Sequence, residues 1–143
     1  MTPSSWFDDI YTGIPEIDRE HRTIAATMDH ARRLITQDAD ADLVAPLIQR
    51  AHSLFEHHIA SEERAFAAIA AGLPVVLVRD HDALHTEVLS GLTAALRRVA
   101  AEDDRAGWIA ALDAAAGALR EDLLTFDSRL AQRLHEGESP ADP

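Results

Sequence analysis

Histidine and carboxylate side chains occur along this chain at positions where a helical protein would normally place apolar core residues. Each of four stretches with helical periodicity contributes at least one of them. Burying so many ionisable groups is costly unless something pairs with them all. A metal centre is the simplest common partner, and the candidates are numerous enough to bind two ions. In chain order they are His21, His58, Glu62, His81, His85, Asp122 and Asp127.

The spacing of these candidates indicates how they could share ions. His81 and His85 are four residues apart, as are His58 and Glu62. This spacing places both members of a pair on one face of a helix. Two imidazoles can then bind one ion, and a carboxylate can bridge two. Asp122 and Asp127 are five residues apart, about 140° around an α-helix. We therefore expect them to flank the apolar stripe and to reach one cluster from two sides.

The candidate ligands combine nitrogen and oxygen without sulfur, because the chain has no cysteine. Such a set suits iron or manganese better than copper–thiolate chemistry. Three carboxylates and one oxo or hydroxo bridge would nearly neutralise two divalent ions, as burial in a low-dielectric core requires. The residue types alone leave the choice between iron and manganese open.

Each part of this pattern also has a simpler explanation. A single helical His–Glu or His–His pair is a weak signal, a lone core histidine is usually just hydrogen-bonded, and a lone aspartate is usually solvated. The metal interpretation depends on the joint pattern across the helices. His57 competes with His58, but one residue is about 100° of rotation, which moves His57 off the apolar face. We expect His30 and His52 near the surface or beside the ligands, and His135 at the end of the last helix, where a cation favours the helix dipole.

Apolar periodicity predicts four amphipathic helices with short connectors. The first begins near Pro15–Asp18, where proline and acidic residues suit a first turn. The others cover about Leu43–Ala71, Val75–Ala101 and Arg105–His135, and Gly72-Leu73-Pro74 ends the second. We expect an all-α protein, an antiparallel up-down-up-down four-helix bundle. Residues 1–16 are expected to form an N-terminal arm, residues 17–136 the bundle and residues 137–143 a disordered tail.

Composition narrows the classes of partner. The net charge of −12 over 143 residues argues against binding nucleic acid or an anionic membrane surface. The longest uncharged stretch, Ala65–Val78, is too short to span a bilayer and contains Gly72 and Pro74. The first nine residues show no signal peptide. We expect one cytoplasmic domain, a monomer or weak oligomer, whose protein partner the sequence does not identify.

The segments around the candidate ligands form an ordered set of motifs. They are Trp6 in the arm, Thr12-Gly13-Ile14, Ile17-Asp18-Arg19-Glu20-His21, His58-Ile59-Ala60-Ser61-Glu62-Glu63, His81-Asp82-Ala83-Leu84-His85, and the stretch from Leu119 to Asp127. Through these motifs, residues 6–134 resemble the hemerythrin family, in particular its bacterial single-domain members.

The resemblance implies a non-heme di-iron centre (Fe2+/Fe3+) with an oxo or hydroxo bridge that binds O2. It implies that His21 and His58 ligate the O2-binding iron, that His81 and His85 ligate the other, and that two carboxylates bridge them. These are Glu62 and Asp127. Around the O2 site, Leu119 keeps the family's apolar position. Ile59 and Ala118 stand where the family has phenylalanine and tryptophan.

Asp122 is the main departure from the family, which has a histidine ligand at this position. An anionic oxygen donor favours Fe(III) over Fe(II), so we expect faster autoxidation. The shorter side chain can also leave a coordination position open, and Ala118 removes bulk, which admits water or peroxide. These changes shift the expected chemistry from a reversible carrier towards an oxidase, a peroxidase or a sensor.

Three functions follow from this interpretation. The leading one is an O2-binding protein for carriage, storage or sensing. The first alternative is a di-iron peroxidase or oxidase that uses the same ligands. The second is a degenerate bundle without metal, with a structural or partner-binding role.

Overall fold

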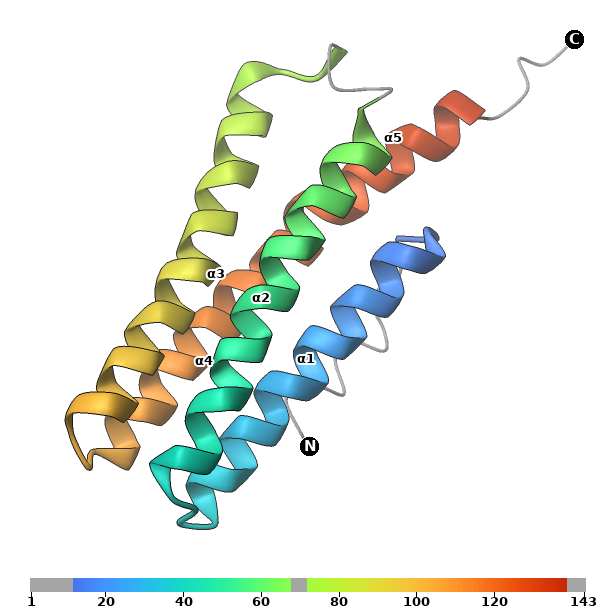
Figure 1. The fold of residues 1–143 in the computed structure, drawn as a ribbon. Coiled ribbons are helices and arrows are strands. Elements are labelled where there is room, and N and C mark those ends of the chain that lie inside the picture. Colours follow the sequence, from blue (N-terminus) through green and yellow to red (C-terminus); the bar gives the residue numbers. More distant parts are fainter. Residues whose placement is uncertain (1–11, 68–71, 139–143) are drawn as a thin grey trace, which may run out of the picture.

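The computed structural model describes residues 12–67 and 72–138. The described chain is helical and contains no strand (Figure 1). Its elements are α1 (Pro15–Thr36), α2 (Ala41–Phe66), α3 (Val75–Ala101), α4 (Arg105–Asp122), the π-helical turn η3 (Leu123–Asp127) and α5 (Ser128–Glu138). Because α4, η3 and α5 follow one another directly, they form one long fourth helix. The predicted four-helix bundle is confirmed.

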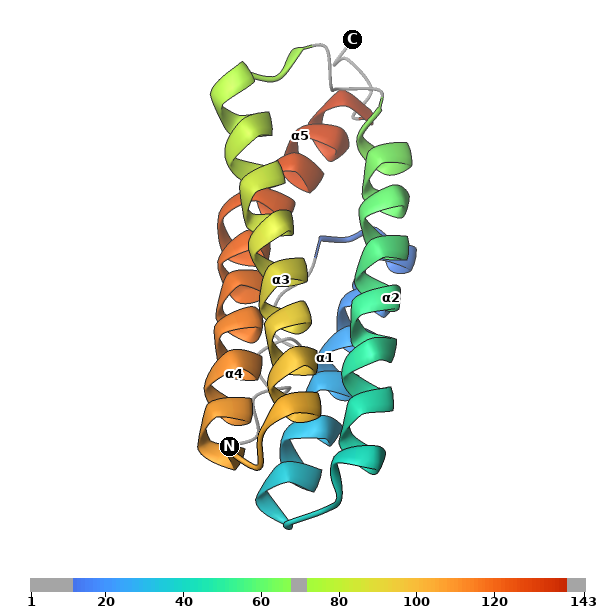
Figure 2. The same ribbon diagram turned by 60° about the vertical axis from the view of Figure 1, so that its left-hand side comes forward.

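The four helices run antiparallel to their chain neighbours. The α1–α2 and α3–α4 connections lie at the same end of the bundle, and the end of α2 and the start of α3 lie at the other (Figures 1 and 2). A Cβ atom at Gly91 of α3 would lie 2.9 Å from the Cβ of Ala115 in α4. Real side chains do not approach this closely, so the glycine permits the close packing of α3 on α4.

Two aspartates organise helix starts. Asp18 accepts hydrogen bonds from the backbone N–H of Thr12 (2.9 Å), the hydroxyl of Thr12 (2.7 Å) and the backbone N–H of Gly13 (3.1 Å). It thereby ties the residues before α1 to the helix, whose first turn contains Pro15. Asp104 caps α4 by accepting from the N–H of Gly107 at 3.0 Å. Such caps satisfy backbone donors that the helix leaves unpaired.

The apolar core is divided into two clusters along the bundle axis. The larger includes Phe55, Val88 and Leu119, and the smaller consists of Phe66, Leu130 and Ala131. On α2, α3 and the fourth helix, the candidate ligands occur in sequence between residues of these two clusters. The polar centre is therefore a layer enclosed by apolar packing on both sides.

Several boundaries differ from the sequence-based expectation. Helix α2 ends at Phe66 rather than Ala71, and residues 68–71 lie outside the described residues. Helix α5 continues to Glu138, two residues past the expected end of the bundle at 136. Residues 1–11, which include Trp6 of the arm, and residues 139–143 of the tail are also outside the described part. Within the described part, no helix is long and apolar enough to cross a membrane.

Candidate metal centre

The π-helical turn in the fourth helix places Asp122 and Asp127 on the same side. In a π-helix the hydrogen bonds join residues five apart, so such residues lie about one turn apart. Nε2 of His81 lies 3.1 Å from Oδ1 of Asp122 and 2.9 Å from Oδ1 of Asp127. The expected separation of 140° was therefore wrong, because it assumed an α-helix through Leu123–Asp127. Both carboxylates are fully buried.

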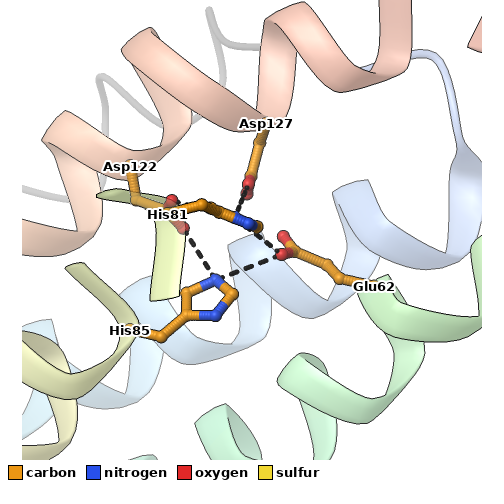
Figure 3. Close-up of side chains that lie close together, drawn as sticks. All are labelled: Glu62, His81, His85, Asp122 and Asp127. Atoms are coloured by element: carbon orange, nitrogen blue, oxygen red, sulfur yellow. Dashed lines mark hydrogen bonds and ion pairs between the residues drawn. The ribbon is translucent and has the colours of Figure 1, made fainter. Parts of the chain in front are cut away.

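One group of donor atoms forms around the α3 histidines. Nε2 of His85 lies 3.2 Å from Oε2 of Glu62 and 3.3 Å from Oδ2 of Asp122. Nε2 of His81 is also 3.2 Å from Oε2 of Glu62. Figure 3 shows these side chains converging from α2, α3 and the fourth helix. Each offers a ligand atom within 4.8 Å of all the others, so together they could hold a cation: Glu62, His81, His85, Asp122 and Asp127. We call this set the His81–His85 half.

A second group forms around the histidines of α1 and α2. Nε2 of His58 lies 2.7 Å from Oε1 of Glu62, and Nε2 of His21 lies 3.1 Å from Oδ2 of Asp127. The two Nε2 atoms are 3.0 Å apart. These residues meet the same 4.8 Å criterion for holding a cation: His21, His58, Glu62 and Asp127. We call this set the His21–His58 half.

Glu62 and Asp127 belong to both halves, and each presents one oxygen to each. Oε2 of Glu62 faces His81 and His85, whereas Oε1 faces His58. Oδ1 of Asp127 faces His81, whereas Oδ2 faces His21. A carboxylate with its two oxygens directed towards different nitrogen pairs has the arrangement needed to bridge two ions.

Unpaired buried atoms indicate that these side chains fit a cation. In the described part of the chain, the buried side-chain atoms without a hydrogen-bond partner all belong to the candidate ligands. They are Nδ1 of His21, both oxygens of Glu62, Nε2 of His85, both oxygens of Asp122 and Oδ2 of Asp127. An unsatisfied buried polar atom costs about 1–3 kcal/mol. A cation would satisfy the carboxylate oxygens and Nε2 of His85.

The histidine pKa values show how strongly the centre attracts positive charge. Burial lowers the pKa of His58, but the charge of Glu62 and the close contacts with Glu20 and Glu62 outweigh it and raise the pKa to about 10. Burial also opposes protonation of His81, yet Asp122, Asp127 and Glu62 raise its pKa to about 12. Burial also lowers the pKa of His85, but Asp122 and Glu62 outweigh it and raise the pKa to about 9. In the metal-free protein, protons occupy positions that cations could take.

The pKa values of the two shared carboxylates, Asp127 and Glu62, are shifted in opposite directions. Burial and the neighbouring charge of Glu62 raise the pKa of Asp127 to about 7. Burial would raise the pKa of Glu62 as well, but its contact with Asp127, which holds the proton, and the charge of His58 keep it well below its usual value. Without a cation, the shared pair thus prefers to keep a proton on Asp127. A cation between the halves would displace that proton.

Glu20 supports the His21–His58 half from outside. Its Oε1 lies 2.9 Å from Nδ1 of His58, and its Oε2 accepts from the hydroxyl of Ser61 at 2.7 Å. The bonds to His58 and Ser61 overcome burial and lower the pKa of Glu20. A carboxylate on the outer nitrogen of a ligating histidine fixes its tautomer and orientation. Sequence reasoning gave no role to Glu20 or Ser61. In the sequence, Glu20 stands next to His21 and Ser61 stands next to Glu62, and nothing else marks them. Their contact can be predicted only when the packing of α1 against α2 is known.

The remaining predicted residues lie as follows. His58 is fully buried, whereas the side chain of His57 is 66% exposed and lies 3.5 Å from Glu20. His30 is exposed, and His52 lies 3.1 Å from Glu56 on the same helix. The side chain of His135 is outside the described part.

The residues expected around the O2 site all belong to or pack against the larger apolar cluster, but they differ in their access to the pocket. Leu119 and Ala118 are buried in the larger apolar cluster. Ile59 lines a pocket of about 350 Å³ that reaches Glu62, His81 and His85. The structure therefore brings Ile59, but not the other two, to an opening beside the centre.

Comparison with known proteins gives one result. Residues 12–134 match the family described as the Hemerythrin HHE cation binding domain. No match was found among curated proteins or among solved structures. The matched range covers most of the chain and contains both groups of donor atoms. The chain therefore belongs to the hemerythrin HHE cation-binding domain family.

Proposed function

We propose that this protein binds two iron ions at the centre and uses them to bind O2, in carriage, storage or sensing. The observation that carries the proposal is the arrangement of Glu62 and Asp127, each with one oxygen towards each half. Family membership supports cation binding. The mixed nitrogen and oxygen donors favour iron or manganese over softer metals. An oxo or hydroxo bridge would complete the charge balance.

We assign His81, His85 and Asp122 to one ion, and His21 and His58 to the other. Asp122 is included because its oxygens lie 3.1 Å from Nε2 of His81 and 3.3 Å from Nε2 of His85. The short aspartate thus reaches the cluster from the fourth helix. Bound iron supplies the electrons that O2 takes up on binding.

The protein holds and shields these donors. Glu20 keeps the proton of His58 on Nδ1, which leaves Nε2 free to face the centre. The ring of Phe55 packs against those of His58 and His85, with centroids 5.6 and 5.5 Å apart. Phe55 therefore excludes water from the side of the larger apolar cluster. We retain Leu119 and Ala118 as candidates for lining the O2 site.

Asp122 also favours a second candidate function, a di-iron peroxidase or oxidase. As a third carboxylate, Asp122 would favour Fe(III) over Fe(II) in bound iron, which would suit oxidative turnover better than reversible O2 binding. The pocket beside His81 and His85 gives small molecules a path to the same half. Steady turnover of peroxide with a reductant would distinguish an enzyme from a binding protein.

The test is metal analysis with visible spectroscopy. Purified protein is loaded with iron, reduced without oxygen and then aerated. We expect two irons per chain, one for each donor group, and an O2-dependent spectrum that decays faster than that of the Asp122→His variant. Fewer than one iron per chain would instead favour a metal-free structural bundle. A stable oxy spectrum that Asp122→His leaves unaltered would contradict the role given to Asp122.

A further inference from the structure

A pocket between α2, α3 and α5 opens onto the centre. Its volume is about 350 Å³. The polar side chains Glu62, His81 and His85 border it on the side of the centre. Its other walls are mainly apolar, and they include Ile59, Phe66, Leu77, Val78 and Leu130. Apolar walls with a few convergent polar groups are typical of small-molecule sites.

The pocket meets only one half of the centre. The side chain of His81 is 10% exposed and that of His85 is 7% exposed. The corresponding values are 3% for His21 and 0% for His58, and neither of these residues lines the pocket. A molecule in the pocket would therefore lie beside the His81–His85 half.

The size of the pocket exceeds what a diatomic molecule needs. A water molecule in the liquid occupies about 30 Å³, so a volume of about 350 Å³ can hold a small organic molecule. The volume also falls at the lower end of the range for ligand sites, about 300–1,000 Å³. O2 alone does not account for an opening of this size.

The exposed charged side chains that line the pocket are negative, which disfavours an anion there. They are the carboxylates of Glu63 and Asp82, and the described residues that line the pocket include no lysine or arginine. A dehydrated cation would find no ligand on the apolar walls, where an unpaired charge is costly. The lining therefore fits a neutral molecule better than an ion of either sign.

We propose that this pocket binds an uncharged, largely apolar organic molecule and holds it next to the His81–His85 half. The inference rests on the proposed function, because the molecule gains its significance from the metal beside it. It adds a class of ligand, and it assigns that ligand to the half that contains Asp122.

Calorimetric titration of iron-loaded protein with toluene tests the inference, with benzoate and benzylammonium as charged probes of similar shape. Iron content is measured on the same samples. We expect toluene to bind saturably and more tightly than either charged probe. Binding of benzoate as tight as that of toluene, or tighter binding of benzylammonium, would overturn the neutral class. Normal iron content without toluene binding overturns the inference and leaves the proposed function intact.

Two matched variants locate the binding. Val78→Trp adds bulk at the pocket lining, whereas Val75→Trp adds it to the same helix at a position that does not line the pocket. Both valines are exposed, so both variants should fold. We expect Val78→Trp to weaken toluene binding at least about tenfold and Val75→Trp to change it by less than about twofold. Ile59→Phe, which fills the pocket from α2, should act like Val78→Trp.

Equal toluene binding in all the variants would place the ligand elsewhere and overturn the inference. Toluene binding in protein that cannot be loaded with iron would reject the proposed function, and with it the link to a metal.

Discussion

The His81–His85 half draws donors from five residues and borders a pocket, whereas the His21–His58 half draws donors from four, and its two histidines are buried and do not line that pocket. The first half has Asp122 as a carboxylate of its own. The second half instead has Glu20 behind His58, outside the cluster. Negative charge is thus placed next to the donors in one half and behind them in the other.

If each half binds an ion, as we propose, this difference would give the two ions different surroundings. The half built from α3 and the π-helical turn is accessible and rich in carboxylate, so it suits reaction with molecules from outside. The half built from α1 and α2, to which the resemblance assigns the O2-binding iron, is instead buried and fixed by an outer carboxylate. The two shared carboxylates, Glu62 and Asp127, couple them.

Removing a shared carboxylate should weaken metal binding in both halves, because each half loses a donor. We expect Glu62→Gln to reduce the iron content to less than half of the wild-type value, since Glu62 faces both histidine pairs. Metal analysis after reconstitution measures the loss. The control is Glu63→Gln, an exposed neighbour, which should retain wild-type iron. Similar losses in both variants would show a general effect of charge.

Removing Asp122 should affect one half only. In Asp122→Asn we expect iron content to fall to about half, as the His81–His85 half loses its own carboxylate while the other half keeps its donors. Glu121→Gln, an exposed neighbour on the same helix, is the matched control. If Asp122→Asn retained both irons with an unchanged spectrum, Asp122 would not be a ligand.

Weakening the outer support should affect the other half. Glu20→Gln removes the charged partner of Nδ1 of His58, and such losses typically cost about 10–100-fold in metal affinity. A chelator competition measures the weaker of the two binding constants. His57→Gln touches the exposed side of Glu20 and should change affinity little. Equal effects of these two variants would argue against a special role for the Glu20–His58 contact.

The smallest expected effect is on the stability of the metal-free protein at different pH values. The folded-state pKa values of His58, His81 and His85 are raised from 6.5 to about 10, 12 and 9. Their stabilising contribution is therefore complete below pH 6.5 and is lost as pH rises through 9 to 12. The raised pKa of Asp127 acts in the same direction between its usual value of 3.8 and about 7.

We accordingly expect the thermal midpoint of metal-free protein to be lower near pH 10 than near pH 6.5. The thermal midpoint of iron-loaded protein should fall less over the same pH interval, because cations replace the protons. Circular dichroism melting curves measure both. A metal-free midpoint that rises over this interval would contradict the protonated state of the histidines.

Much of the fold follows from local patterns in the sequence. The apolar periodicity marks four helices, and Gly72-Leu73-Pro74 marks the break before α3. The phase of the apolar residues also distinguishes His58 from His57, because one residue of rotation separates a buried from an exposed face. These predictions succeed because amphipathic helices bury one stripe, and that stripe is visible in a single chain.

Three features are not visible in this way. The π-helical turn changes the phase of Asp127 relative to Asp122, yet the apolar spacing of Leu119, Leu123, Phe126 and Leu130 fits an ordinary α-helix. The contact of Glu20 with His58 depends on the register of α1 against α2. The pocket depends on side chains from α2, α3 and α5, which only the tertiary structure brings together.

The most direct test of an unequal two-ion centre is a crystal structure of the iron-loaded protein with diffraction measured at the iron absorption edge. The account predicts two anomalous peaks, one bordered by His81, His85 and Asp122, the other by His21 and His58. Glu62 and Asp127 should lie between them. A single peak, or an iron beside His81 and His85 that lacks Asp122 as a neighbour, would contradict it.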